Sequence, residues 1–348
     1  MHNIDNWQEL LRQKEDEIIV LKDKLDTFKE KEKTQESVFA EVYQLYKVIK
    51  EQKKELEELH KEVLQKNKEI KQQAEELYTQ NETLLVTMAK LTEKEKHILQ
   101  SINYAQRIQE AMLPFLERIE QSLDKENFFI LYKPRNIVSG DFYFFEQIGH
   151  KIVIIAADCT GHGVPGALMS MIGINILEEI IISLKITQPD IILNQLHKKI
   201  QYALKQQETQ NKDGMDIAVC VIDKTKKTIE YAGANNSIYV IQEGVLQDHK
   251  ADKFAIGGHQ TEIERIFTKH SIDISKPTML YLFSDGYQDQ FGGIENRKFM
   301  KKRFRELLSS IYTKPLDLQK IILDDTLKDW QMNTYEQTDD ILVMGIKL

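Results

Sequence analysis

The N-terminal third of the chain carries a hydrophobic pattern that predicts one long helical region. Residues 1–113 contain neither proline nor glycine, the two residues that most weaken a helix. From position 42 onward, apolar residues return at every seventh position: Val42, Ile49, Leu56, Val63, Ile70, Leu77, Leu84, Leu91, Ile98, Ala105 and Met112. A strict seven-residue repeat is typical of a left-handed coiled coil. We therefore expect residues 1–98 to form a coiled coil for dimerisation and signal input.

The second core position of each heptad is less regular. If this series occupies d, the a positions are Tyr46, Lys53, His60, Asn67, Ala74, Asn81 and Met88; if it occupies a, the d positions include Leu45, Leu59, Gln73 and Thr87. Asparagine at a favours a parallel dimer in register, at some cost in stability. Leu11, Ile18 and Leu25 give earlier heptads, and we expect a break from Lys29 to Glu36. The alternative is a single long solvated helix that dimerises weakly or not at all.

After about residue 130 the pattern changes to short strands. Runs rich in β-branched and aromatic residues occur as FFILYK, KIVIIAAD, DIAVCVID, TIEYAG, SIYVIQ, TMLYLFSD and ILVMGIKL. Helical patterns lie between them, at Pro165 to Leu184, Pro189 to Gln207 and Leu316 to Trp330. Short turns between successive strands favour largely antiparallel sheets covered by helices over a doubly wound parallel sheet. We expect an α+β domain over 126–348, joined to the coil by a helical linker over 99–125.

Composition narrows the class of protein. A net charge of −8 and a pI near 5.7 argue against nucleic-acid binding. No stretch comes near the roughly 20 apolar residues that cross a bilayer, and the first residues lack a signal-peptide core. Cys159 and Cys220 have no zinc-like or CxxC spacing, which favours a reducing compartment. We expect a cytoplasmic protein without direct membrane insertion; attachment through a partner stays open.

Four aspartates stand where strand-like runs begin or end. They are Asp141 in SGDFYFF, Asp158 in IVIIAADCTGHG, Asp285 in MLYLFSDG and Asp339 in TDDILVMGIKL. Each alone is usually a turn residue, because aspartate forms local hydrogen bonds there. Several carboxylates converging at strand ends would make a hard-oxygen site that suits Mg²⁺ or Mn²⁺.

A glycine-rich turn follows Asp158 and precedes the helix expected from Pro165. Gly161, Gly163 and Gly166 let the backbone bend sharply and approach an ion or phosphate, and the helix N-terminus favours anions. A tight connection between strand and helix explains the same glycines.

In this order and spacing, the four motifs SGDFYFF, ADCTGHGVPGA, LFSDG and TDDILVMGIKL resemble the SpoIIE-type branch of the type-2C (PPM) serine/threonine protein phosphatases. The resemblance covers roughly Glu126 to Leu348. It implies an α-β-β-α sandwich, in which two sheets are flanked by helices, with a two-metal Mn²⁺ or Mg²⁺ site at one edge.

The resemblance also implies roles for individual residues. Asp158 matches the ligand that bridges both metals, and Cys159 matches the residue that lends its backbone carbonyl. Asp285 and Asp339 match the ligands of one metal, and Asp141 matches the acidic residue that holds the second, partly through water. Asp340 is the neighbour of a ligand and a weaker candidate.

Further candidates have competing interpretations. His162 could protonate the leaving alkoxide, or it could support the glycine turn. Arg135 could hold the substrate phosphate, or it could be a surface arginine. Asp216 stands near the position where some relatives bind a third metal, or it simply starts a strand. The Cys159 thiol is not expected to be a nucleophile, because acidic neighbours raise a thiol pKa.

The implied activity is hydrolysis of phosphoserine or phosphothreonine by a metal-activated water, without a phospho-enzyme. The implied substrate is a phosphorylated STAS-type anti-sigma-factor antagonist of bacterial partner switching, and the coil and linker would regulate the enzyme. A phosphatase-like scaffold that only binds partners is the alternative. A cyclase-like or kinase-like domain lacks the support of a lysine-bearing phosphate loop.

Overall fold

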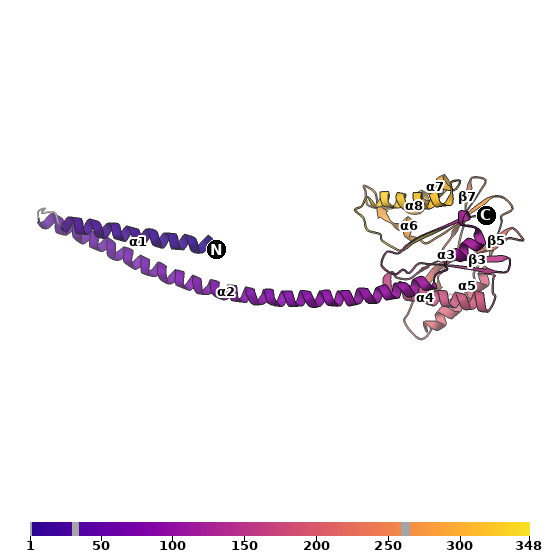
Figure 1. The fold of residues 1–348 in the computed structure, drawn as a ribbon, viewed down its shortest axis with the longest axis horizontal. Helices are drawn as coiled ribbons and strands as arrows, with labels where there is room; N and C mark the ends of the chain where they lie inside the picture. The colour runs from indigo at the N-terminus through magenta and orange to yellow at the C-terminus, as the bar shows by residue number, and fades with distance from the viewer. Residues whose placement is uncertain (1, 30–34, 259–264) are drawn as a thin grey trace. The chain divides into compact units, whose positions relative to one another are not determined.

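The computed structural model describes residues 2–29, 35–258 and 265–348 (Figure 1). The chain divides into two compact units, Met1–Lys96 and His97–Leu348. Helix α2 (Gln35–Met112) runs from the first unit into the second. The residues of the expected linker, 99–125, belong to the second unit.

In the first unit, helix α1 (His2–Lys29) packs antiparallel to the beginning of α2. Gln52 Nε2 donates to Glu17 Oε2 at 3.1 Å, and Lys14 Nζ lies 3.7 Å from Glu55 Oε2. The half-buried residues of the pair recur at alternating steps of three and four, as in a heptad seam; they are Trp7, Leu11, Lys14, Ile18, Leu21 and Leu25 on α1, and Val42, Leu45, Ile49, Gln52, Leu56, Leu59 and Val63 on α2. The seven-residue series thus occupies a in this segment, with Leu45 and Leu59 at d.

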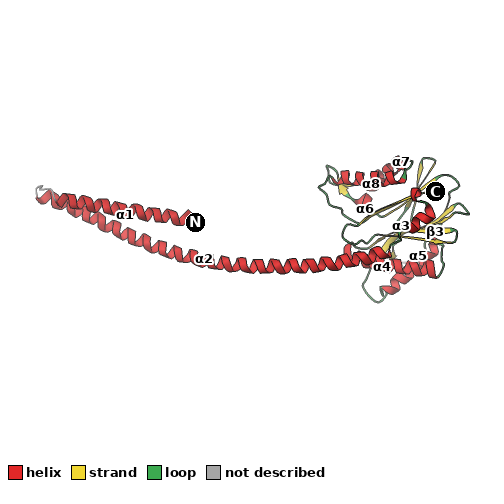
Figure 2. Ribbon diagram, in the orientation of Figure 1, coloured by secondary structure: helices red, strands yellow, loops and turns green. Residues whose placement is uncertain are grey.

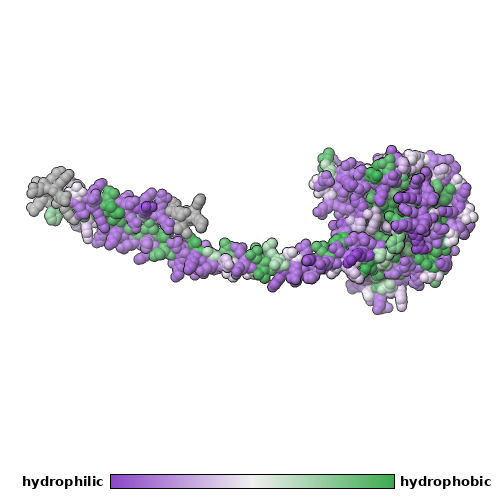
Figure 3. Space-filling view, in the orientation of Figure 1, coloured by the Kyte–Doolittle hydropathy of each residue, from purple (hydrophilic) through white to green (hydrophobic). Residues whose placement is uncertain are grey.

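The expected break from Lys29 to Glu36 falls largely on residues 30–34, which lie outside the described part of the chain. From Ile70 to Ile98 the apolar series of α2 is exposed, including Leu77, Leu84 and Leu91. Figure 3 shows hydrophobic side chains interspersed among hydrophilic ones along this helix. The first heptads are therefore covered by the chain's own α1, and the later heptads are not.

The second unit is built on two antiparallel sheets. The five-stranded sheet has the order β1 (Phe128–Lys133), β13 (Ile341–Lys347), β10 (Thr278–Phe283), β6 (Ile238–Gln242) and β7 (Val245–His249). The six-stranded sheet has the order β2 (Phe142–Ile148), β3 (Lys151–Cys159), β4 (Gly214–Asp223), β5 (Thr228–Ala234) and β9 (His270–Asp273), with β8 (Ile256–Gly257) paired to β4. β11 (Phe291–Gly292) and β12 (Arg297–Lys298) form a separate small hairpin.

Helices cover the outer faces of both sheets (Figure 2). α4 (Gly163–Glu178), a π-helical turn (Glu179–Ser183) and α5 (Pro189–Ala203) pack on the six-stranded sheet. α7 (Met300–Ile311) and α8 (Leu316–Gln331) pack on the five-stranded sheet, while α3 (Leu116–Leu123), the 3-10 turn Lys125–Asn127 and α6 (Gly286–Asp289) are short connecting elements. This is the expected α-β-β-α sandwich, so the fold prediction is confirmed.

Alternating side chains build two cores around the five-stranded sheet. Leu280 and Leu282 face the six-stranded sheet, whereas Tyr281 and Phe283 pack under α7 and α8 with Phe304. The central strand β3 is buried from Ile152 to Ala157, because both of its faces are covered. The central strands are therefore rigid supports for whatever stands at their ends.

One expectation from composition is corrected by the structure. Helical residues Gly163–Ser183 are long and apolar enough to cross a membrane by length and composition. Half of that window is buried within the fold, where α4 packs against β3 and α5. A core helix covered on one face explains the apolar run, and this is a weak indication of a membrane span.

Candidate functional site

Two of the aspartates meet where the sheets lie against each other. Asp158 stands near the end of β3, opposite Asp216 of β4, and Asp285 stands two residues beyond the last residue of the buried strand β10. The carboxyl groups of Asp158 and Asp285 lie within hydrogen-bonding reach of each other. The sandwich thus brings together two acidic groups that are 127 positions apart in the sequence, one from each sheet.

Asp141 lies behind this pair and is 1% exposed. Its Oδ2 accepts a hydrogen bond of 2.5 Å from Ser284 Oγ, and Ser284 Oγ in turn accepts one of 2.9 Å from the backbone N–H of Leu342. Ser284 precedes Asp285, so one short segment positions both carboxylates. The sequence analysis did not single out this serine, although its place beside Asp285 was a usable signal.

The adjacent pair Asp339 and Asp340 divides into different environments. Asp340 is buried, and its two oxygens accept backbone N–H bonds of 2.7 Å each, from Arg135 and Gly140. Asp340 thereby fixes the loop that leads to Asp141. Asp339 is half-buried, and this partial burial raises the pKa of its carboxyl group.

Glycines allow the loops of the site to touch backbone to backbone. A Cβ on Gly166 would lie 2.2 Å from the Gly161 carbonyl oxygen and 2.8 Å from Gly140 Cα. A Cβ on Gly140 would lie 2.6 Å from Gly161 O and 3.3 Å from Cys159 O. Gly161 has φ +83°, which side chains disfavour. The glycine turn therefore brings the Cys159 carbonyl and the loop before Asp141 together.

Burial and mutual repulsion raise the pKa values of the carboxyl groups in this cluster. Burial, and then the charges of Asp340 and Asp339, raise the pKa of Asp141 well above its ordinary value. Burial, and then the charges of Asp141 and Asp285, raise the pKa of Asp158 well above its ordinary value. Asp285 reaches solvent, yet partial desolvation and the charges of Asp289 and Asp339 raise its pKa to about 6. Such a group of acids is stabilised by cations.

The acidic side chains of the site are all carboxylates, and hard divalent cations such as Mg²⁺ and Mn²⁺ prefer carboxylate oxygens as ligands. Across residues 2–29, 35–258 and 265–348, however, no three or more His, Cys, Asp and Glu side chains are placed so that they could already hold an ion. The carboxylates instead accept local hydrogen bonds, as Asp141 does from Ser284 and Asp216 does from Asn235 at 2.9 Å. Enclosing an ion therefore requires these side chains to turn toward a common centre.

The remaining candidates lie around the rim. His162 is exposed at the start of α4, and its Nδ1 lies 3.0 Å from Asn136 Oδ1. The side chain of Arg135 is exposed. The Cys159 thiol is buried, and burial followed by the Asp158 charge raises its pKa well above the ordinary value. A protonated, buried thiol is a poor nucleophile.

A polar cleft opens beside Asp158, Asp216 and Asp285. It is also lined by residues of the turn between β5 and β6, and by Asp248, Lys250, Gln288 and Lys301. Asn235 holds this turn in a left-handed conformation, with φ +53°. The sequence analysis assigned no function to the asparagines of this turn.

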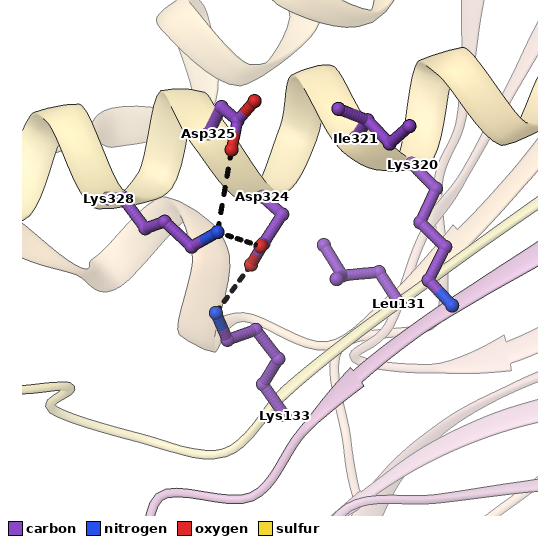
Figure 4. A pocket seen from close by; sticks show the side chains of 7 residues that line it. All are labelled: Leu131, Lys133, Lys320, Ile321, Asp324, Asp325 and Lys328. Carbon is purple, nitrogen blue, oxygen red and sulfur yellow. Dashed lines mark hydrogen bonds and ion pairs between the residues drawn. The ribbon is translucent and has the colours of Figure 1, made fainter.

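A second hollow lies between β1 and α8 (Figure 4). Most of its charged groups pair with one another: Asp324 pairs with Lys133 and with Lys328 at 2.5 Å each, and Lys328 also reaches Asp325 at 3.4 Å, while Lys320 stands apart from these pairs. We assign no chemistry to this hollow.

Comparisons with known proteins agree with this architecture. The sequence model of the family "Stage II sporulation protein E (SpoIIE)" matches residues 148–348. The phosphoserine phosphatase RsbU of Bacillus subtilis (strain 168) is 28% identical over 250 residues, which cover 66% of this chain and 69% of that protein. The SiaA-PP2C domain of Pseudomonas aeruginosa is 31% identical with a TM-score of 0.66, covering 73% of this chain and 98% of that one. The PP2C phosphatase domain of SpoIIE from Bacillus subtilis shares the fold at 17% identity, with a TM-score of 0.51 over 64% of this chain and 62% of that one.

Proposed function

Because the chain belongs to the SpoIIE family, we propose that it is a metal-dependent phosphatase that hydrolyses phosphoserine or phosphothreonine on a protein. The observation that carries the proposal is the meeting of Asp158 and Asp285, delivered by separate sheets to one edge of the sandwich. Divalent cations would neutralise the carboxylates that the fold brings together here, and acids with perturbed pKa values are common at functional sites.

We assign the ion-holding role to Asp158, the Cys159 carbonyl, Asp141, Asp285 and Asp339. When bound, two Mn²⁺ or Mg²⁺ ions would polarise the phosphoryl group and lower the pKa of a water. Asp216, hydrogen-bonded to Asn235, is the residue available for a third ion. Asp340 drops out of the ligand set, because both of its oxygens are engaged by backbone N–H groups.

The chain's own residues supply orientation and proton transfer around the phosphoryl group. Arg135 stands at the rim with its backbone fixed by Asp340, and its guanidinium can pair with phosphoryl oxygens. His162 is held by Asn136 and exposed, so its ring can give a proton to the leaving serine oxygen. The glycine turn keeps backbone atoms, rather than side chains, against the reacting group.

The substrate and setting follow from the family rather than from the site. We propose a phosphorylated STAS-type anti-sigma-factor antagonist as the substrate, in a cytoplasmic partner-switching pathway. RsbU, named as a phosphoserine phosphatase, supports a phosphoprotein substrate for this chain as well. A parallel homodimer through the exposed heptads of α2 would form the input side of the molecule.

Hydrolysis with and without metal tests the proposal. Full-length protein treated with chelator, and then given Mn²⁺ or Mg²⁺, should release phosphate from a phosphoserine peptide and from p-nitrophenyl phosphate. Asp158→Asn should abolish both activities while the protein stays folded by circular dichroism. Metal binding with no turnover on either substrate would favour the alternative, a phosphatase-like scaffold that acts by binding partners.

A further inference from the structure

We propose that the polar cleft beside Asp158 and the basic groove that adjoins it on α7 bind the polypeptide around the phosphorylated residue, and that they select substrates with acidic side chains next to it. This inference rests on the proposed function, because it names the substrate class of the same site. Asp158, Asp285 and Lys301 all line the cleft. Lys301 also lines the adjoining groove, together with Lys302 and Arg305.

The size of the cleft indicates what it can hold. Its volume is about 130 Å³, below the roughly 300–1,000 Å³ of ordinary small-molecule sites. A single polar side chain or a phosphoryl group fits such a space, whereas a nucleotide-sized cofactor does not. The groove that continues from Lys301 gives an extended chain a path away from the carboxylates.

Two buried carboxamides in the cleft have unmet hydrogen-bonding capacity. Asn236 is 9% exposed and Gln288 is 5% exposed. Among the residues that the structure describes, Asn236 Nδ2 and Gln288 Oε1 have no hydrogen-bond partner. Buried polar atoms in native proteins are nearly always paired, with protein, water or ligand. A peptide backbone offers a carbonyl to the first and an N–H to the second.

The unmet donor on Asn236 is held in a fixed place. Its backbone N–H donates to Ala234 O at 2.6 Å, and its carbonyl accepts the Tyr231 hydroxyl at 2.8 Å. Neighbouring Asn235 binds Asp216. The turn between β5 and β6 is therefore a well-fixed wall of the cleft, and Asn236 is one of the residues that line it.

The charge of the groove favours an acidic occupant. Asp248 pairs with Lys250 and lies 4.0 Å from Arg305, so its single negative charge is shared between two cations. Lys301 and Lys302 make no ion pair with any residue in the described part of the chain, and Glu306 is the one carboxylate among the residues that line the groove. In a protein of net charge −8, an excess of cations beside the site is a local feature. It attracts carboxylates and disfavours basic sequences.

The test compares two phosphoserine peptides of equal length, one flanked by Asp and Glu and the other by Asn and Gln at the same positions. We expect the full-length protein to show a higher kcat/KM for the acidic peptide by about 5- to 10-fold at low salt, with the difference mainly in KM and shrinking as salt rises. In Lys301→Ala/Lys302→Ala the preference should fall below about 2-fold. Lys301→Arg/Lys302→Arg should keep it, and so should Lys320→Ala on α8. Equal kcat/KM for the two peptides, or a preference that survives the double alanine variant, would overturn the proposal.

Binding separates this inference from the proposed enzymatic activity. If neither peptide is hydrolysed under any metal condition, the phosphatase proposal fails, and fluorescence anisotropy with the labelled peptides then tests the surface alone. Asp158→Asn protein that binds the acidic peptide more tightly than the neutral one, through Lys301 and Lys302, would support the docking surface. Equal binding of the two peptides would overturn it.

Discussion

The side-chain amide of Gln109 in α2 donates a hydrogen bond to the backbone of Ser139 and accepts another from it. Its Nε2 donates to Ser139 O at 2.6 Å, and its Oε1 accepts from Ser139 N at 3.1 Å. Gln109 is 3% exposed and also donates to Ser170 Oγ of α4 at 2.8 Å. Ser139 stands two residues before Asp141. The end of the long helix is thus fixed to the loop that positions a proposed metal ligand.

This pairing predicts that Gln109→Ala weakens metal binding as well as the fold. The substitution leaves the buried N–H of Ser139 without a partner, which costs about 1–3 kcal/mol, and leaves the Ser139 carbonyl with only the longer hydrogen bond of 3.4 Å from Ser170 Oγ. Freed from α2, the loop should hold Asp141 less firmly. We expect a lower melting temperature and a higher Mn²⁺ concentration for half-maximal activity, measured by thermal unfolding and by metal titration.

A neighbouring glutamine on the same helix provides the control. Gln106 makes an exposed hydrogen bond of 3.0 Å to Glu110, a pair worth only a few tenths of a kcal/mol, roughly 0.2–0.5. Gln106→Ala should leave both measurements close to those of the parent. An unchanged metal titration for Gln109→Ala would show that α2 does not act on the site through Ser139.

Asp158→Asn should stabilise the metal-free protein and at the same time remove most of its activity. Asp158 is a half-buried acid whose neighbours oppose its ionisation, so removing its charge relieves repulsion in the metal-free protein. We expect a higher melting temperature without metal, little further rise on adding Mn²⁺, and a loss of activity of about 100-fold or more, since even indirect ligand partners contribute about 10- to 100-fold. Asp325→Asn on α8 is the matched surface control. A metal-free melting temperature below that of the parent would contradict the electrostatic argument.

The raised pKa values predict how metal binding depends on pH. Asp285 titrates in the metal-free protein with a pKa of about 6, above its ordinary value of 3.8. Protons therefore compete with metal below about pH 6, and we expect Mn²⁺ affinity to fall between pH 7.5 and 5.5 with proton uptake on release. Calorimetric titrations in two buffers of different ionisation enthalpy measure those protons directly.

The raised pKa of Asp285 makes its contribution to folding stability depend on pH in the direction opposite to that of most carboxyl groups. A carboxyl whose pKa is higher when folded binds protons more tightly in the native state, so its contribution to stability is lost as pH rises from about 4 through 6. Stabilisation by metal should therefore be larger at pH 7.5 than at pH 5. Asp223, Asp273 and Asp324 have lowered pKa values, and their contribution is lost only as pH falls below about 4. A metal-induced shift in melting temperature that is equal at both pH values would exclude the proposed competition.

The strand ends that carry the aspartates could be predicted because their signals are local. Apolar runs rich in β-branched and aromatic residues, each followed by a turn residue, placed Asp158 and Asp285 correctly at the ends of β3 and β10. The roles of Asp339 and Asp340 could not be separated in this way. Which of the two side chains turns inward depends on backbone N–H groups of Arg135 and Gly140, and those are about 200 positions away.

Other features depend on contacts that carry no sequence pattern. Asn236 and Lys301 come together only because the turn after β5 and the helix α7 border the same cleft. Helix α7 itself was missed by the sequence analysis. The pairing of α1 with α2 could not be predicted either. A heptad repeat packs equally well against an antiparallel helix of the same chain and against a parallel helix of another chain.

The exposed heptads of α2 predict where a dimer forms. Leu84 lies on the seven-residue seam and is 56% exposed, and Leu91 is 60% exposed one heptad later. If a second copy covers this seam, Leu84→Lys/Leu91→Lys should convert a dimer to a monomer in sedimentation equilibrium, since each change puts a charge into a packed core position. Leu85 is 67% exposed but lies one position off the seam, so Leu85→Lys is the matched control and should stay dimeric. A protein that is monomeric before any substitution would instead favour the alternative of a single solvated helix.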